Sequence, residues 1–132
     1  MRQHAEILDL ISSSDVNLSV HSLLNYLSDD VEYFMLASCP DAPLLRQFCG
    51  REFVAEYLSI LPQVYEIASR SVAKVVYDGP YTIMMGQDIA TVYPNKRKVI
   101  ANWTLILVIR LGKIQRMQYI FQNMTDAISA SA

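Results

Sequence analysis

The sequence contains only two cysteines, Cys39 and Cys49, and neither lies in a CxxC motif or at a Cys/His spacing that binds metal. We therefore expect no disulfide framework, no metal site and no cofactor. The basic residues form no long face and the net charge is −2, which argues against nucleic acid as a partner. No apolar run approaches membrane-spanning length, and the start, MRQHAEILDL, lacks the apolar stretch of a signal peptide. These absences predict a cytoplasmic protein without a membrane partner.

The composition favours a packed core. Apolar residues make up 52% of the 132 residues, more than a disordered chain carries. The sequence has no repeat, no low-complexity segment and no linker, so we expect one domain spanning 1–132.

Helical patterns dominate the first half of the chain. Apolar residues at helical spacing predict helices over about 3–12, 19–27 and 51–61, the last one stopped by Pro62. The acidic pair Asp29-Asp30 is expected to end the second helix. A short strand, VEYFML at 31–36, and a loop over 37–50 lie between the second and third helices.

The second half shows only strand patterns. Four strands are predicted at about 69–78, 82–93, 98–110 and 114–123, with turns at DGP, PNK and LGK. The order of helices followed by a meander of long strands indicates an α+β fold, in which helices cover one face of a curved, mostly antiparallel sheet.

Three stretches carry a resemblance to a known family: LSDDVEY, GREFVAEYL and GKIQRMQYIFQN. They resemble the helix end and first strand, the start of the third helix, and the closing strand of the nuclear transport factor two-like superfamily, which includes ketosteroid isomerases and polyketide-cyclase-like proteins. The resemblance implies a cone-shaped fold, with a strongly curved sheet wrapped around three helices and a pocket in its mouth. It also implies a homodimer formed through the outer face of the sheet.

Strand periodicity sorts the side chains into two faces. A turn of two or four residues between the last two strands would place Met117, Tyr119 and Phe121 with Asn102 and Thr104, whereas a three-residue turn would place Trp103 and Leu105 there instead. We expect the former, and matching to the isomerases makes that face the inner one. The predicted pocket is lined by Tyr33, Met35, Tyr57, Gln87, Asn102, Thr104, Met117, Tyr119 and Phe121. The predicted outer face carries Trp103, Leu105, Leu107 and Ile120 and is expected to be covered by a second copy of the chain.

The residues that the isomerases use are absent. Their catalytic carboxylate falls at Met35, or at Tyr33 if the alignment shifts by two residues, and neither is an acid. Their hydrogen-bonding tyrosine falls near Ile7, and their protonated aspartate falls at Thr104 or Ile106. We therefore expect no steroid isomerisation by the usual residues.

Acid or base candidates are few. His4 in the first helix is the predicted catalytic residue, although a histidine there is also typical of a solvated helix end. Asp88 and Glu32 are the next acids, and the expected strand faces point both of them away from the pocket. Gln87 and Asn102 need either a wet pocket or a mutual hydrogen bond, because an unpaired buried amide is unfavourable.

Two functional hypotheses follow. The first is a protein that binds an apolar cyclic metabolite, a flat ligand with a few oxygens, and that acts as an isomerase, cyclase or lyase if it is an enzyme. The second is a non-catalytic dimerisation or interaction module, in which Tyr33, Tyr57 and Tyr119 fill the cone by packing against each other.

Overall fold

A computed structural model describes residues 2–12, 22–38, 43–93 and 96–126. Within these ranges lie two α-helices, one short 3-10 helix and six strands. Their bounds are α1 Arg2–Ser12, η1 Leu24–Tyr26, β1 Leu27–Ser38, β2 Pro43–Cys49, α3 Arg51–Val64, β3 Tyr65–Asp78, β4 Tyr81–Val92, β5 Arg97–Arg110 and β6 Lys113–Asp126. Neither described helix is long and apolar enough to cross a membrane.

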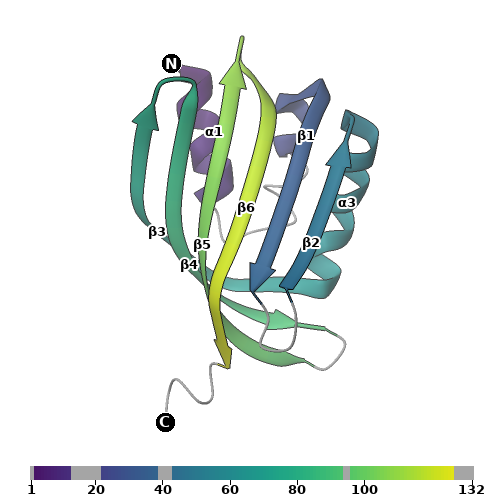
Figure 1. Ribbon diagram of the computed structural model, residues 1–132, viewed down its shortest axis with the longest axis vertical. Helices are drawn as coiled ribbons and strands as arrows, with labels where there is room; N and C mark the ends of the chain where they lie inside the picture. Colours follow the sequence, from purple (N-terminus) through teal and green to yellow (C-terminus); the bar gives the residue numbers. More distant parts are fainter. Residues whose placement is uncertain (1, 13–21, 39–42, 94–95, 127–132) are drawn as a thin grey trace.

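The six strands form one mixed sheet in the order β2-β1-β6-β5-β4-β3. β1 and β6 run parallel, and every other neighbouring pair is antiparallel. The sheet is open, with β2 and β3 at its edges, and α1 and α3 lie on the same face of it (Figure 1). The α+β layout and the mostly antiparallel sheet are therefore confirmed.

Several predicted boundaries were wrong. The expected loop over 37–50 contains the edge strand β2, which begins at Pro43. Proline fits there because the start of an edge strand has no need of its N–H in the ladder. β1 begins at Leu27, so Asp29 and Asp30 lie in a strand and do not end a helix. The first residues of the predicted second helix, 19–21, lie outside the described residues, and the described remainder holds the 3-10 helix Leu24–Tyr26 and the first residue of β1, Leu27.

The third predicted helix runs further than expected. α3 continues through Pro62 to Val64. Proline removes only one hydrogen bond from the last turn, so the helix continues for two residues beyond it. The helix ends at Tyr65, which is extended and whose N–H donates to the carbonyl of Leu61.

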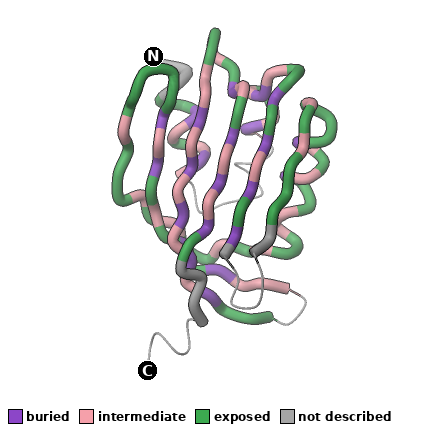
Figure 2. The backbone as a smooth tube through the Cα atoms, in the orientation of Figure 1, coloured by how far each residue is buried: buried purple, intermediate pink, exposed green. Residues whose placement is uncertain are grey.

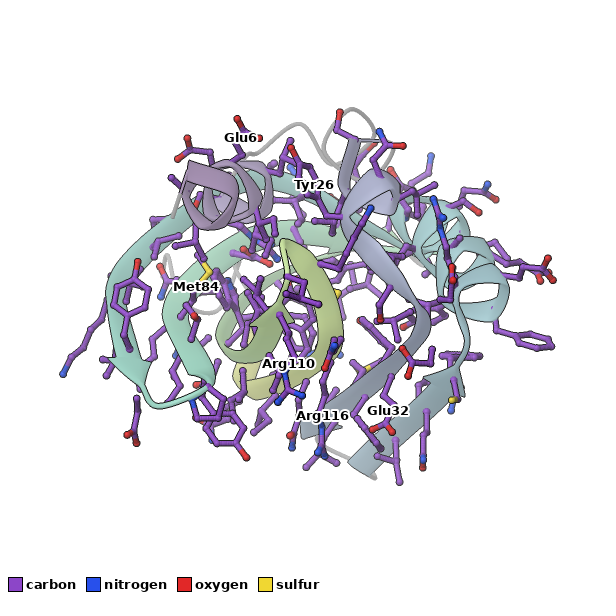
Figure 3. All side chains as sticks on the ribbon, turned by 90° about the horizontal axis from the view of Figure 1, so that it is seen from above. Glu6, Tyr26, Glu32, Met84, Arg110 and Arg116 are labelled. Atoms are coloured by element: carbon purple, nitrogen blue, oxygen red, sulfur yellow. The ribbon has the colours of Figure 1, made fainter. Side chains whose placement is uncertain are left out.

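The core lies between the two helices and one face of the sheet, which we call the inner face. Buried and partly exposed residues alternate along β5 and β6, as Figure 2 shows, because successive strand side chains point to opposite faces. α1 contributes Ile7 and Ile11 to this core, and α3 contributes Val54 and Leu58. In Figure 3, Met84 points to the helix side of the sheet, while Glu32 and Arg116 point away from it.

The predicted pairing of β5 with β6 was wrong because of a β-bulge. The turn has the expected two residues, since Arg110 pairs with Lys113 and Ile109 with Ile114. Gln115 is then skipped, and Val108 pairs with Arg116. One extra residue reverses which side chains share a face. Trp103, Leu105 and Leu107 are consequently buried on the inner face and not on the outer face.

Candidate functional site

The predicted pocket residues of β1 and β6 come together on the inner face. Tyr33 pairs with Met117, and Met35 pairs with Tyr119. All four are buried, as is Phe121. Tyr57 reaches this group from α3, where its ring lies 5.2 Å from the ring of Tyr33. These six side chains form one wall, and all six belong to the pocket lining predicted from the sequence.

The rings of this wall pack on one another. The ring centroid of Tyr33 lies 6.3 Å from that of Tyr119. Tyr119 stacks on Phe121 at 5.5 Å, and Tyr57 stacks on Phe48 at 4.7 Å. Much of the inner space beside β1 is therefore filled by aromatic side chains of the chain itself.

Three predicted pocket residues lie on the opposite, outer face of the sheet. Gln87, Asn102 and Thr104 share that face because of the bulge at Gln115 and the pairing of β4 with β5. The Gln87 amide donates a 3.1 Å hydrogen bond to the side-chain oxygen of Asn102. A mutual hydrogen bond, one of the two alternatives considered above, thus satisfies this amide pair.

The remaining candidates are divided. The backbone of His4 lies in α1, but its side chain is outside the described residues. Glu32 is exposed and points away from the helices, as expected. Asp88 was expected to point outward and instead lies on the inner face, completely buried.

Asp88 forms a buried ion pair with Arg70 of β3. Arg70 Nε donates to Asp88 Oδ1 at 2.7 Å, and Arg70 Nη2 donates to Oδ2 at 2.8 Å. The Arg70 side chain is 8% exposed and Asp88 is fully buried. The fork geometry is the bidentate arrangement in which a guanidinium binds a carboxylate most strongly.

Two further donors complete the coordination of Asp88. The indole N–H of Trp103 donates to Oδ1 at 2.9 Å, and the hydroxyl of Tyr65 donates to Oδ2 at 2.9 Å. A carboxylate offers about four acceptor positions, so the described donors occupy all of them. Asp88 can take a proton from a ligand only if one of these donors first moves away.

Arg70 also connects the sheet to α1. Its Nη1 donates to the main-chain carbonyl of Ile11 at 3.1 Å and to the hydroxyl of Tyr119 at 3.3 Å. The guanidinium lies 4.6 Å from the ring centroid of Trp103 and 5.8 Å from that of Tyr119. The cation is held by a carboxylate, a helix-end carbonyl and two aromatic rings.

A second β-bulge brings Arg70 to this position. At the β3–β4 turn the pairing of Asp78 with Tyr81 would set Ser71 opposite Asp88, but Ala73 is skipped and Arg70 pairs with Asp88. Bulges often redirect a side chain next to a functional site in this way. Arg70 therefore lies opposite Asp88 because of one extra residue in β3, whereas Trp103 shares the face of Asp88 through the unbroken pairing of β4 with β5.

Gly86 makes the space for Trp103. A Cβ atom at Gly86 would lie 2.5 Å from Trp103 Cζ2 and 2.3 Å from the carbonyl oxygen of Ser71. The indole can lie against β4 and reach Asp88 only because this residue has no side chain. A glycine inside a strand pattern indicates such a close approach, so Gly86 was the signal in the sequence that could have located this cluster.

The environment keeps the hydroxyls of Tyr33 and Tyr65 protonated. Burial, followed by the charge of Asp88 and the hydrogen bond to it, raises the pKa of Tyr65 well above its usual value. Burial, with Tyr57 and Tyr119 nearby, also raises the pKa of Tyr33. Burial alone would lower the pKa of Arg70, but Tyr119 and Asp88 outweigh it and raise the pKa. The site therefore holds one fixed cation, one fixed anion and several neutral hydroxyls.

Comparison with known proteins gives matches in structure alone. No protein-family model and no curated protein matches the sequence. A candidate SnoaL-like polyketide cyclase from Mesorhizobium loti superposes with a TM-score of 0.70 at 15% identity, over 89% of this chain and 95% of the other. A protein of ketosteroid-isomerase-like fold from Catenulispora acidiphila, in complex with trimethylamine, gives 0.69 at 13% identity, over 86% and 83%. An LEH-like epoxide hydrolase from Mycobacterium tuberculosis gives 0.65 at 12% identity, over 92% and 84%.

The fold is that of the nuclear transport factor two-like superfamily. The resemblance found in the three sequence stretches is thus confirmed. At these identities the likeness shows the fold and says nothing about the reaction.

The chain also has a hollow that lies apart from the Asp88 cluster. A surface depression of about 630 Å³ lies at the start of α3, lined by Asp29, Cys49, Gly50, Arg51, Glu52, Phe53 and Ala55. It includes no residue of the Asp88 cluster. Cys49 is exposed there and unbridged, and Cys39 lies outside the described residues. Among the residues that the structure describes, no three His, Cys, Asp or Glu side chains gather as metal ligands do.

Proposed function

We propose that this chain binds a small, flat, mostly apolar molecule on the inner face, beside Arg70, Asp88 and the wall of six side chains. The observation that carries the proposal is the buried Arg70–Asp88 pair with its four-donor carboxylate. Removing two charges from water costs several kcal/mol per ion, and apolar side chains of similar volume would often stabilise a fold as well or better. A charged pair enclosed by aromatic rings is therefore a candidate binding site.

The structural neighbours support the same class of function. They include proteins described as a candidate polyketide cyclase, a trimethylamine complex and an epoxide hydrolase. Ligand chemistry varies widely among proteins that share a fold, so these names support small-molecule binding and no particular substrate.

Catalysis as an isomerase, cyclase or lyase would need a free acid or base. The four donors on Asp88 leave it suited to holding Arg70 and poorly suited to accepting a proton. His4 stays the predicted catalytic residue. Replacing His4 by alanine should abolish any such activity, and full activity in His4→Ala would remove this residue from the mechanism.

A thermal-shift screen with steroid-like and polyketide-like compounds tests the binding proposal. A ligand that binds only the native state raises the melting temperature, by mass action, as its concentration exceeds its Kd. Hits should lose their effect in Arg70→Met or Asp88→Leu, measured against the melting temperature of each variant alone. Silence across a broad panel would refute the proposal.

A second candidate function is a non-catalytic dimerisation module. The stacked rings beside β1 favour it, because they fill inner space that a ligand would need. The outer face favours it too, since apolar side chains there are half-buried or exposed. They are Phe34, Leu36, Ile83, Met85, Ile89, Ile100, Ile106, Val108 and Ile120. An apolar face of this extent commonly pairs with a second copy.

The dimer prediction has to be tested at other residues than those first expected. Of the predicted interface residues, only Ile120 lies on the outer face. A charge at Ile106 should block pairing across this face, so Ile106→Glu is expected to be a monomer by light scattering. Leu111→Glu, at a 94% exposed turn position, is the matched control and should keep the mass of the unmodified chain. Equal masses for both variants would place any interface elsewhere.

A further inference from the structure

The two edges of the sheet differ in how they are protected. β3 carries two register shifts and the inward-pointing charge of Arg70, features that keep an edge strand from pairing with another chain. β2 has neither, since its residues pair with β1 without a shift from Pro43 to Cys49. In the described part of the chain no further strand pairs with β2. Its outward-pointing main-chain groups are therefore open to an added strand.

α3 presents apolar side chains next to this edge. Tyr57 faces β2, since its ring stacks on that of Phe48 at 4.7 Å. Phe53, Ile60 and Val64 follow the helical repeat from Tyr57 and lie on the same side of the helix, which we call the α3 flank. They are 63%, 46% and 45% exposed, so the described residues leave them largely uncovered. α3 lies beside β2 at the edge of the sheet (Figure 1), so the flank and the open edge are neighbours.

The hollow at the start of α3 adjoins both surfaces. It is lined by Cys49, the last residue of β2, and by Phe53 of the α3 flank. A strand added along β2 would therefore run toward a depression of about 630 Å³, which leaves room for one of its end residues.

Arg46 gives the open edge a charge. It pairs with the buried Met35 and therefore lies on the side of β2 that faces the helices. Burial raises the pKa of Tyr57, and the charge of Arg46 opposes this rise, which agrees with that placement. Among the described residues no carboxylate forms an ion pair with Arg46, and its guanidinium donates to the main-chain carbonyl of Leu45 at 3.1 Å.

A second copy of the chain fits this edge poorly. If two β2 strands paired antiparallel over their full length, the middle residue of each would face the same residue of the other. That residue is Arg46, at the centre of Pro43–Cys49. Like charges directly opposite each other are destabilising, whereas opposite charges stabilise such a pair. The edge therefore favours a different chain that carries a carboxylate at this position.

We propose that β2 and the α3 flank bind an extended peptide segment of a partner protein, which joins the sheet as a strand beside β2. Alternate side chains of this peptide point toward α3, so an aspartate or glutamate opposite Arg46 has apolar residues two positions away on each side, against the α3 flank. The intervening residues lie on the outer face and suit strand-forming side chains such as threonine. The site is separate from the inner-face cluster, so the proposal is independent of small-molecule binding.

A peptide with the core Ile-Thr-Glu-Thr-Ile tests the proposal, because its symmetric pattern places the glutamate opposite Arg46 in either strand direction. Fluorescence anisotropy should show this peptide binding about fivefold more tightly than one with lysine in place of the glutamate. Arg46→Glu should reverse the preference. Arg110→Glu makes the same charge reversal at an exposed position on β5, which is not adjacent to β2, and should leave the preference unchanged.

Hydrogen exchange followed by NMR tests the main-chain part of the site. In the free chain the outward-pointing amides of β2 should exchange rapidly, and the peptide should protect them while leaving exchange in β3 unchanged. Phe53→Ser should weaken peptide binding about tenfold, because it removes apolar surface that the peptide covers. It should not lower the melting temperature, since this side chain is exposed.

Three results would overturn the proposal. They are no binding at millimolar peptide, a preference for glutamate that survives Arg46→Glu, and bound peptide without protection of the β2 amides. Protection of every β2 amide in a free chain that light scattering shows to be a dimer would identify the occupant as a second copy, which also overturns it. Each of these results would leave small-molecule binding on the inner face standing.

Discussion

The Asp88 carboxylate accepts four hydrogen bonds inside the fold. Its replacement by asparagine removes the negative charge but keeps nearly the same side-chain shape. The asparagine oxygen could still accept from Arg70 Nε and Trp103. Its amide nitrogen, however, would face Arg70 Nη2, and both groups are donors. The substitution therefore leaves a buried guanidinium without its counter-ion.

The size of the effect follows from the burial of both partners. Breaking a buried ion pair by removing one charge costs about 3–5 kcal/mol. An unfolding entropy of about 2.1 cal/mol/K per residue gives roughly 0.28 kcal/mol/K for 132 residues, so the melting temperature should fall by about 11–18 °C. Thermal unfolding followed by circular dichroism, together with urea denaturation, measures both quantities.

The matched control makes the same chemical change at an exposed position. Glu32→Gln removes a carboxylate charge from the outer face of β1 and should alter the free energy of unfolding by no more than about 0.5 kcal/mol. A melting temperature of Asp88→Asn within about 3 °C of the unmodified chain would refute the interpretation of Asp88 as the anchor of Arg70.

The double variant Arg70→Met/Asp88→Leu separates the pair from its partners. Removing both charges should destabilise the fold less than the sum of the two single changes, because each single change leaves an unpaired buried charge and the double variant leaves none. Recovery should be incomplete, since Arg70 also holds the carbonyl of Ile11. Strict additivity of the two single variants would show that the two charges do not depend on each other.

Three further predictions concern the same cluster. Gly86→Ala should lower the free energy of unfolding by about 1–3 kcal/mol, because the new Cβ would meet the indole of Trp103 and the main chain of β3. It should also change the fluorescence of Trp103, the single tryptophan. An unchanged fluorescence spectrum together with an unchanged urea midpoint would contradict the close approach. Tyr65→Phe removes one hydrogen-bond donor from the Asp88 carboxylate and should lower the free energy of unfolding by about 1.5–3 kcal/mol, measured by urea denaturation. Tyr81→Phe, at an exposed position, is the control and should leave the free energy of unfolding unchanged. Equal values for the two variants would show that the hydrogen bond to Asp88 does not stabilise the fold. The raised pKa values of Tyr33 and Tyr65 mean that the folded chain keeps protons which unfolded tyrosines lose above about pH 10, so stability should be complete below that pH and fall as the pH rises past it. Tyrosinate absorbance should then show a group of tyrosines that titrates only on unfolding, and a native chain in which all tyrosines titrate near pH 10 would show that these hydroxyls are not buried.

The amino-acid sequence determined most of the helices and strands and, between bulges, which side chains of one strand share a face. Its patterns located both described helices and five of the six strands, and the three resembling stretches identified the fold. Within β1 and β6 the alternation of Tyr33, Met35, Met117 and Tyr119 was sufficient to place these side chains together, because the period of a strand is two. β2 was missed because Pro40 and Pro43 made its segment look like a loop.

Only the tertiary structure decided which faces of neighbouring strands coincide. β5 is apolar on both faces, with Trp103, Leu105 and Leu107 on one and Ile106 and Val108 on the other, so its sequence alone does not show which face is buried. Single-residue bulges at Ala73 and Gln115 set the alignment, and each reverses the assignment as far as the next register shift, which lies between Ile67 and Ser69 in β3 and beyond Gln122 in β6. The register between neighbouring strands, bulges included, is set only when the strands pair, and the Arg70–Asp88–Trp103 cluster exists because of it.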